Sequence, residues 1–135
     1  MIDCQTETPG TFPQTIRVRA HTFRADVSAS DGGTDSAPGT HDYFDASLAA
    51  CKALTATWYA RKHNIPLESV ETHVERDDRE ERRGKYVLKI RVAFHGHLTD
   101  DHRAKLYAAV AKCPIHKLMT TADVIIETAP LSESP

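Results

Sequence analysis

HDYFDASLAACKALTATWYARKH, residues 41–63, is the stretch that decides the fold. Nearly every position from 43 to 60 is apolar or small. A helix that is apolar almost all round belongs in the interior of a protein. The basic end of the stretch suits a helix C-terminus, and Pro66 prevents its continuation. We therefore predict a long buried helix over 41–63, with Asp42 as its N-cap.

Length and composition narrow the class of protein. The chain has 135 residues, 40% hydrophobic and 27% charged, which is typical of a single soluble globular domain. A formal net charge of −2 gives no reason to expect nucleic acid or a membrane surface as a partner. No apolar run could span a bilayer, and the N-terminus lacks the features of a signal peptide. We expect one cytoplasmic domain over 1–135, with a loose N-terminus (1–14) and a polar tail (129–135).

Segments of alternating apolar and polar residues flank the helix and predict strands. They lie at 15–27 (as a hairpin with a turn near Ala20), 67–75, 86–94 and 123–128. Thr99 is predicted to cap a second, amphipathic helix, which Pro114 ends or bends. The order β-β-α-β-β-α-β, joined by hairpins, indicates an α+β fold with antiparallel sheet.

The cysteines leave two interpretations open. Cys51 has only apolar or small neighbours on its helical face, which favours an inert packing residue. A thiolate there needs a cation from elsewhere in the fold, for which the strand arginines Arg17, Arg19 and Arg24 are the candidates. Spacing alone does not show that Cys51 and Cys113 meet. They are either small core residues or a reactive pair, and three cysteines in a reducing compartment do not make a structural disulfide framework.

Metal chemistry is weakly indicated. His95 and His97 share one side of a strand, and Cys113 precedes His116 by three residues, but no second pair stands at a metal-binding spacing. The histidines do not cluster in the sequence, so a metal-dependent hydrolase is disfavoured and no metal or cofactor is expected. Cys4 lies in the loose terminus and is expected to have no redox role.

Several motifs together resemble the OsmC/Ohr family, in particular an OsmC-like branch with a GGxD loop and a CPxH motif. They are HTFRADV (21–27), GGTD (32–35), PGTHDYFDASLAACKALT (38–55), YARK (59–62), GHLT (96–99) and KCPIHK (112–117). The resemblance covers about residues 17–128. The combination of an ASLAAC helix with a CPxH motif at this separation is specific evidence for the family, whereas either motif alone is weak evidence.

The resemblance implies an antiparallel sheet wrapped around a long buried central helix, in an intertwined homodimer with two sites at its interface. It makes Cys51 the peroxidatic cysteine and Cys113 the resolving cysteine. An arginine supports the thiolate in the peroxidase members, and we assign Arg19 at the hairpin turn to this role, with Arg24 as a substitute. Asp42 is the nearest carboxylate to the family's glutamate position, and two roles are open for it: the orienting carboxylate, or only the N-cap of the helix.

One position departs from the family pattern. Thr40 and His41 stand where the peroxidase members have a proline and a glutamate, ten residues before the cysteine. This departure keeps a non-catalytic function open.

The function that the resemblance implies is a thiol-dependent peroxidase that reduces organic hydroperoxides in oxidative-stress defence, with an external dithiol as reductant. Leu48, Leu54 and Trp58 offer an apolar face for such a substrate. The alternative is a non-catalytic OsmC-like domain that binds a small apolar ligand or senses redox state.

Overall fold

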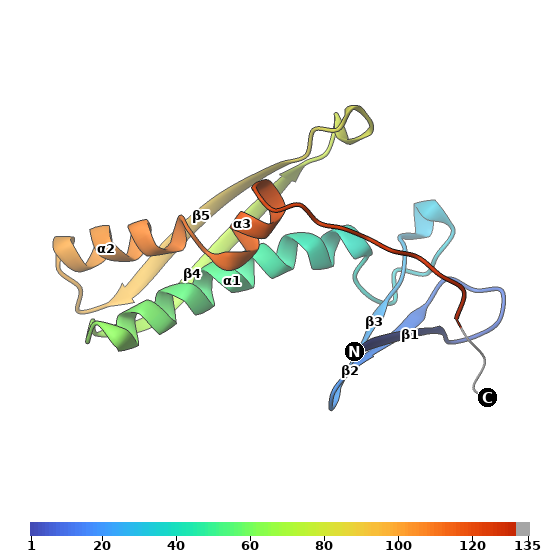
Figure 1. The fold of residues 1–135 in the computed structure, drawn as a ribbon, viewed down its shortest axis with the longest axis horizontal. Helices are drawn as coiled ribbons and strands as arrows, with labels where there is room; N and C mark the ends of the chain where they lie inside the picture. The colour runs from blue at the N-terminus through green and yellow to red at the C-terminus, as the bar shows by residue number, and fades with distance from the viewer. Residues whose placement is uncertain (132–135) are drawn as a thin grey trace. The chain divides into compact units, whose positions relative to one another are not determined.

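The computed structural model describes residues 1–131, which form an α+β fold (Figure 1). In chain order its elements are β1 (Ile2–Thr6), β2 (Gln14–Val18), β3 (His21–Ala25), η1 (Ala29–Asp31), α1 (Thr40–Lys62), β4 (Leu67–Asp77), η2 (Glu81–Arg83), β5 (Val87–Gly96), α2 (Asp100–Val110) and α3 (Pro114–Thr120). Strands β1, β2 and β3 form one sheet in that order, and β4 pairs with β5. The predicted fold class is confirmed.

The chain divides into two compact units, and α1, β4 and β5 run through both. The first unit is Met1–Ala50 with Thr72–Arg91, and the second is Cys51–Glu71 with Val92–Pro135. The first contains the three-stranded sheet, the start of α1 and the tip of the β4–β5 hairpin. The second contains the rest of α1, the base of that hairpin, α2 and α3.

The N-terminal sheet of the first unit corrects the prediction of a loose terminus over 1–14. Strand β1 lies antiparallel to β2, with Ile2 opposite Val18. Strands β2 and β3 form the predicted hairpin, with Val18 opposite His21. Every residue of β1 is exposed, so its sequence has no buried face that could indicate a strand. Backbone pairing with a distant segment is what orders it.

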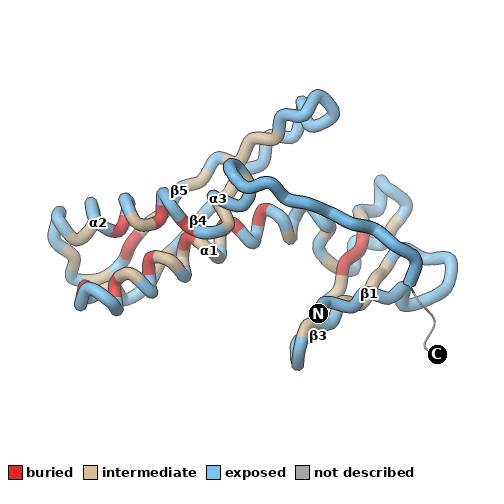
Figure 2. The backbone as a smooth tube through the Cα atoms, in the orientation of Figure 1, coloured by how far each residue is buried: buried red, intermediate tan, exposed pale blue. Residues whose placement is uncertain are grey.

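The second unit holds the apolar core. Its buried residues are Ala56, Ala60, Ile65, Phe94, Leu106 and Val110. They come from α1, β5, α2 and the connection after α1, and the buried positions lie on the facing sides of these elements (Figure 2). Thr99 caps α2 as predicted, since its side chain accepts a hydrogen bond from the His102 amide.

Helix α1 has the predicted extent but is not buried all round in this chain. Its buried residues recur every three or four positions and include two charged side chains: Asp45, Leu48, Lys52, Ala56 and Ala60. Its large apolar residues Leu54 and Trp58 are instead 69% and 63% exposed. The helix therefore turns Leu48 inward together with small and charged side chains, and leaves the large apolar side chains of Leu54 and Trp58 outward.

The C-terminal part differs from the prediction in two ways. Helix α2 ends at Val110, and Pro114 begins a separate helix α3, because proline is well suited to the first position of a helix. Residues 123–128 were expected to form a strand but form none, and Ile125 and Ile126 are more than four-fifths exposed. An extended segment needs a neighbouring strand to form a ladder, and within residues 1–131 no strand pairs with this one. Of the predicted polar tail, 129–131 are exposed and 132–135 lie outside the described residues.

Candidate functional site

The two cysteines of interest lie on different elements of the second unit and are both free thiols. Cys51 is partly buried on α1, and Cys113 is fully buried at the N-cap of α3. Cys113 has an extended backbone, and its carbonyl accepts a hydrogen bond from the Lys117 amide, which closes the first turn of α3. Because Pro114 lacks an N–H, no amide is left unsatisfied beside the thiol.

Lys52, the residue after Cys51, connects α1 to both sides of Cys113. Its buried ammonium donates to the Val110 carbonyl at 2.7 Å and lies 3.3 Å from His116 Nδ1. Val110 precedes Cys113 by three residues and His116 follows it by three. The structure thus brings the segment that carries Cys113 against the turn of α1 that carries Cys51.

Lys52 was not among the candidates chosen from the sequence. A lysine inside an apolar helix reads as a solvated side chain, and only its spacing of four from Leu48 and from Ala56 places it on the buried face. His116 was considered in the sequence only together with Cys113, as a weakly indicated metal-binding pair. In the structure its Nδ1 lies 3.3 Å from the Lys52 ammonium.

Asp42, the expected orienting carboxylate, lies in the first unit and pairs with an arginine that was not predicted. Helix α1 starts at Thr40, so Asp42 is its third residue and not the N-cap. It accepts a hydrogen bond from the Gly39 amide at 2.8 Å and pairs with Arg76 Nη2 at 2.8 Å. The hydrogen bond from Arg76, followed by that from Gly39, holds the pKa of Asp42 below its usual range.

Asp45, one turn later, completes a cluster around Arg76. Its carboxylate accepts from Arg76 Nε at 2.5 Å and from the Tyr86 hydroxyl at 2.6 Å. The hydrogen bonds to Asp42 and then Asp45 raise the pKa of Arg76. Burial, reinforced by the bond to Asp45, raises the pKa of Tyr86 to about 12. The two carboxylates in the first turns of α1 are thus paired with one arginine, Arg76 of β4, which lies more than 30 residues away in the sequence.

His41 occupies the position of the family's glutamate and contacts a carboxylate itself. Its Nε2 lies 2.5 Å from Glu81 Oε1 of the short helix η2, with both side chains about half exposed. Glu81, in the connection between β4 and β5, therefore supplies a partner to the start of α1 within the first unit.

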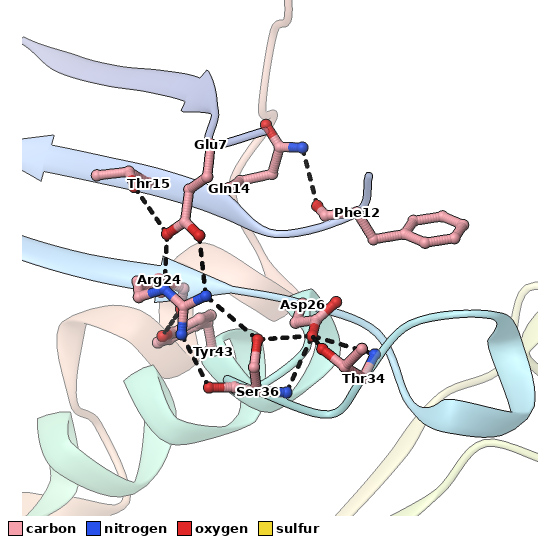
Figure 3. Close-up of polar contacts among 9 residues, drawn as sticks. All are labelled: Glu7, Phe12, Gln14, Thr15, Arg24, Asp26, Thr34, Ser36 and Tyr43. Carbon is pink, nitrogen blue, oxygen red and sulfur yellow. Dashed lines mark hydrogen bonds and ion pairs between the residues drawn. The ribbon is translucent and has the colours of Figure 1, made fainter. Parts of the chain in front are cut away.

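The arginines proposed from the sequence have other surroundings. Arg19 is exposed in the β2–β3 turn with φ of 51°, and within residues 1–131 its side chain has no hydrogen bond or ion pair. Arg24 forms a two-pronged ion pair with Glu7, with Nε–Oε1 and Nη2–Oε2 distances of 2.6 and 2.9 Å, and also donates to the Ser36 carbonyl (Figure 3). Its guanidinium is committed to linking the sheet to the loop before α1. Arg17 is exposed on β2.

The buried carboxylate of Asp26 holds the GGTD loop (32–35) in place through hydrogen bonds. Asp26 accepts hydrogen bonds from the hydroxyl and amide groups of Thr34 and Ser36, at 2.7–3.4 Å (Figure 3). It also accepts a hydrogen bond from the Val27 amide at 2.8 Å. The bonds from Ser36 are the main reason that the pKa of Asp26 is strongly lowered. A Cβ at Gly33 would lie 2.3 Å from the Val27 carbonyl oxygen, so only glycine fits there. This loop sets the approach of the chain to α1.

Neither metal-binding clusters nor membrane-spanning helices occur in the described part of the chain. Within residues 1–131, histidines, cysteines and carboxylates do not gather in groups of three or more that could hold a metal ion. None of the helices over the same residues has the length and apolar content that crossing a membrane requires.

The fold and two of its three free cysteines define an α+β protein with one thiol on the long helix and one in a CPxH motif. The family model described as OsmC-like protein matches residues 33–129. The chain therefore belongs to the OsmC-like protein family. No curated protein sequence matches it.

Solved structures share this fold at low sequence identity. An OsmC-like protein of Mycoplasma pneumoniae has a TM-score of 0.70 and 17% identity, over 90% of this chain and 86% of its own. The organic hydroperoxide resistance protein OsmC of Legionella pneumophila has a TM-score of 0.61 and 17% sequence identity, and the match covers 90% of each chain. The organic hydroperoxide resistance protein OhrB of Bacillus subtilis has a TM-score of 0.57 and 19% sequence identity, and the match covers 90% of this chain and 91% of that protein. At these identities the likeness establishes the fold alone.

Proposed function

We propose that this protein is a thiol-dependent peroxidase that reduces organic hydroperoxides, with Cys51 as the peroxidatic and Cys113 as the resolving cysteine. One observation carries the proposal beyond family membership. Lys52 holds the flanks of Cys113 against the turn of α1 that bears Cys51. Two free thiols on neighbouring segments of one unit are what a reversible cysteine cycle needs.

The cycle has three balanced steps. The Cys51 thiolate attacks the hydroperoxide O–O bond, which leaves Cys51 as a sulfenic acid and releases an alcohol once the leaving oxygen takes a proton. The Cys113 thiol condenses with the sulfenic acid to a disulfide and water. An external dithiol then reduces the disulfide by thiol–disulfide exchange. Because Cys51 is more exposed than Cys113, the reductant would attack the Cys51 sulfur and Cys113 would leave first.

Of the two supporting charges expected from the sequence, this proposal keeps Arg19 and gives Asp42 another role. Arg19 remains the candidate that would assist the Cys51 thiolate, since its guanidinium has no ion pair in the described chain, whereas Arg24 is held by Glu7. Asp42 acts on Arg76 and so contributes to the structure of the helix start. An arginine near the reacting oxygen would stabilise its developing negative charge.

The outward face of α1 supports both an apolar substrate and a homodimer. Leu48 is buried and so unavailable to a substrate, but Leu54 and Trp58 are largely exposed. Large apolar side chains aligned on one helix face indicate a surface that another molecule covers. A second copy of the chain is the partner that we propose, with an organic hydroperoxide at the interface.

A peroxide-consumption assay with a dithiol tests the proposal. Wild type should consume cumene hydroperoxide faster than hydrogen peroxide. Cys51→Ser should abolish turnover, and Cys113→Ser should allow a single turnover that ends in a trapped sulfenic acid. Cys4→Ser is the matched control and should behave as wild type. A wild type that leaves every hydroperoxide intact, with Cys51 unreactive toward alkylating agents, would refute the proposal.

The alternative is a non-catalytic domain that binds a small apolar ligand or senses redox state. The specific observation in its favour is that His41 replaces the family's glutamate and is engaged by Glu81, while Asp42 is engaged by Arg76. Under this alternative the protein binds an apolar fluorescent probe, yet Cys51→Ser changes neither probe affinity nor peroxide consumption.

A further inference from the structure

The buried ammonium of Lys52 is the feature of the second unit that the proposed cycle leaves unexplained. Lys52 is 6% exposed, and within residues 1–131 no carboxylate pairs with it. Burying a charge without a counter-charge is costly unless hydrogen bonds compensate. Its two partners are the Val110 carbonyl oxygen and His116 Nδ1, neither of which carries a negative charge. We call the contacts of Lys52 with Val110 and His116 the Lys52 bridge.

The Lys52 bridge joins three elements at once. Val110 is the last residue of α2, where carbonyls lack helical partners and a cation is favoured. His116 lies in the first turn of α3. The bridge therefore closes the α2–α3 connection from both sides, and Cys113 stands in its middle.

The bridge also determines the state of the His116 ring. A lysine ammonium only donates hydrogen bonds, so Nδ1 must accept. The neutral ring then carries its proton on Nε2. A ring protonated on both nitrogens could not take part in this contact.

We propose that Lys52 and His116 are positioning residues for the resolving step, because they hold Cys113 where it captures the Cys51 sulfenic acid before a second peroxide does. The inference rests on the proposed peroxidase function. In the productive branch, the Cys113 thiol and the Cys51 sulfenic acid form a disulfide and release water. In the competing branch, the sulfenic acid and a second hydroperoxide give a sulfinic acid and an alcohol. The bridge acts on the division between these branches and not on the first oxidation.

A step-resolved assay on reduced full-length protein tests this. Lys52→Met removes the ammonium and keeps the side-chain length, and His116→Ala removes the second acceptor. After one equivalent of cumene hydroperoxide, we expect sulfenic acid formation within twofold of wild type and disulfide formation at least tenfold slower. Excess peroxide should drive both variants to the sulfinic acid, measured by mass spectrometry with a sulfenic-acid trap. Lys52→Arg, which retains the cation, should recover part of the resolving rate.

Lys112→Met is the matched control. Lys112 adjoins Cys113 as Lys52 adjoins Cys51, but it is exposed. It should resolve at the wild-type rate. Thermal unfolding of each variant verifies folding, and His116→Ala, at a half-buried position, serves if Lys52→Met does not fold. Disulfide formation within twofold of wild type in the folded bridge variants would overturn the inference.

A second measurement separates this inference from the proposed function. In glutathione redox buffers, the equilibrium between the two free thiols and the Cys51–Cys113 disulfide requires no peroxide. Lys52→Met should lower the oxidation constant about tenfold, or about 30 mV. A wild type inert to peroxides refutes the function, whereas an unchanged constant in the variant refutes the bridge.

Discussion

Replacing Asp45 by alanine tests how α1 tolerates a carboxylate on its inward face. Asp45 is 8% exposed and is shared by Arg76 Nε and the Tyr86 hydroxyl. In the variant, Arg76 keeps its ion pair with Asp42, while the Tyr86 hydroxyl loses its only acceptor in the described chain. The substitution therefore removes one charge-assisted pair and leaves one partly buried hydroxyl without a partner.

The magnitude follows from the two bonds. A hydrogen bond to a charged group contributes about 1.5–3 kcal/mol, and breaking a fully buried ion pair costs about 3–5 kcal/mol. The Arg76 side chain is 30% exposed and retains a second carboxylate, which places the loss at the low end. We expect the free energy of unfolding to fall by about 2–3 kcal/mol and the melting temperature by roughly 8 °C.

Urea unfolding measures the loss, and ultraviolet titration of the phenolates measures its cause. The pKa of Tyr86, about 12, should fall toward its usual value in Asp45→Ala, but only part of the way because burial remains. Asp77→Ala is the control, since Asp77 pairs with an Arg79 side chain that is 84% exposed, and its unfolding midpoint should not move. A loss below about 0.5 kcal/mol in Asp45→Ala, with an unmoved Tyr86 titration, would refute the reasoning.

Three other predictions follow from burial and protonation. Leu106→Ala, at a fully buried core position, should reduce the free energy of unfolding by about 2–5 kcal/mol in urea, whereas a loss under about 1 kcal/mol would place Leu106 outside the core. Because the pKa of Tyr86 is raised on folding, its contribution to stability is complete below about pH 10 and is lost as the pH rises toward 12; Tyr86→Phe should remove this alkaline loss from the stability profile. Alkylation followed by mass spectrometry should modify Cys4 first, then Cys51, and Cys113 only on unfolding; early labelling of Cys113 would contradict its burial.

The sequence was sufficient for the elements whose signals are local. The approximate extent of α1, the hairpin turn near Ala20 and the cap at Thr99 were predicted from local patterns, and the structure confirms them, although α1 starts at Thr40 and the predicted N-cap Asp42 is wrong. Local patterns suffice there because capping bonds and hairpin pairings join residues a few positions apart. The family was also recognisable, since each of its motifs is an unbroken stretch of sequence.

The sequence was insufficient where a partner comes from far along the chain. Arg76 reaches Asp45 across 31 positions, and Lys52 reaches Val110 across 58. Each charge looks solvent-facing until its partner is known, so neither Arg76 nor Lys52 was singled out from the sequence. In the same way β1 was missed and 123–128 was predicted as a strand, because a ladder depends on the neighbour that the tertiary structure provides.

The sequence by itself determined that a long helix carries Cys51, within a residue of the observed bounds Thr40–Lys62, and that Cys113 opens a CPxH motif. Only the tertiary structure decided which face of that helix turns inward. Asp45 and Lys52 lie inside because Arg76, Tyr86, Val110 and His116 meet them there, whereas Leu54 and Trp58 lie outside. Hydrophobicity predicts the reverse, but a charge is stable in the interior wherever the fold supplies hydrogen-bond partners that water would otherwise provide.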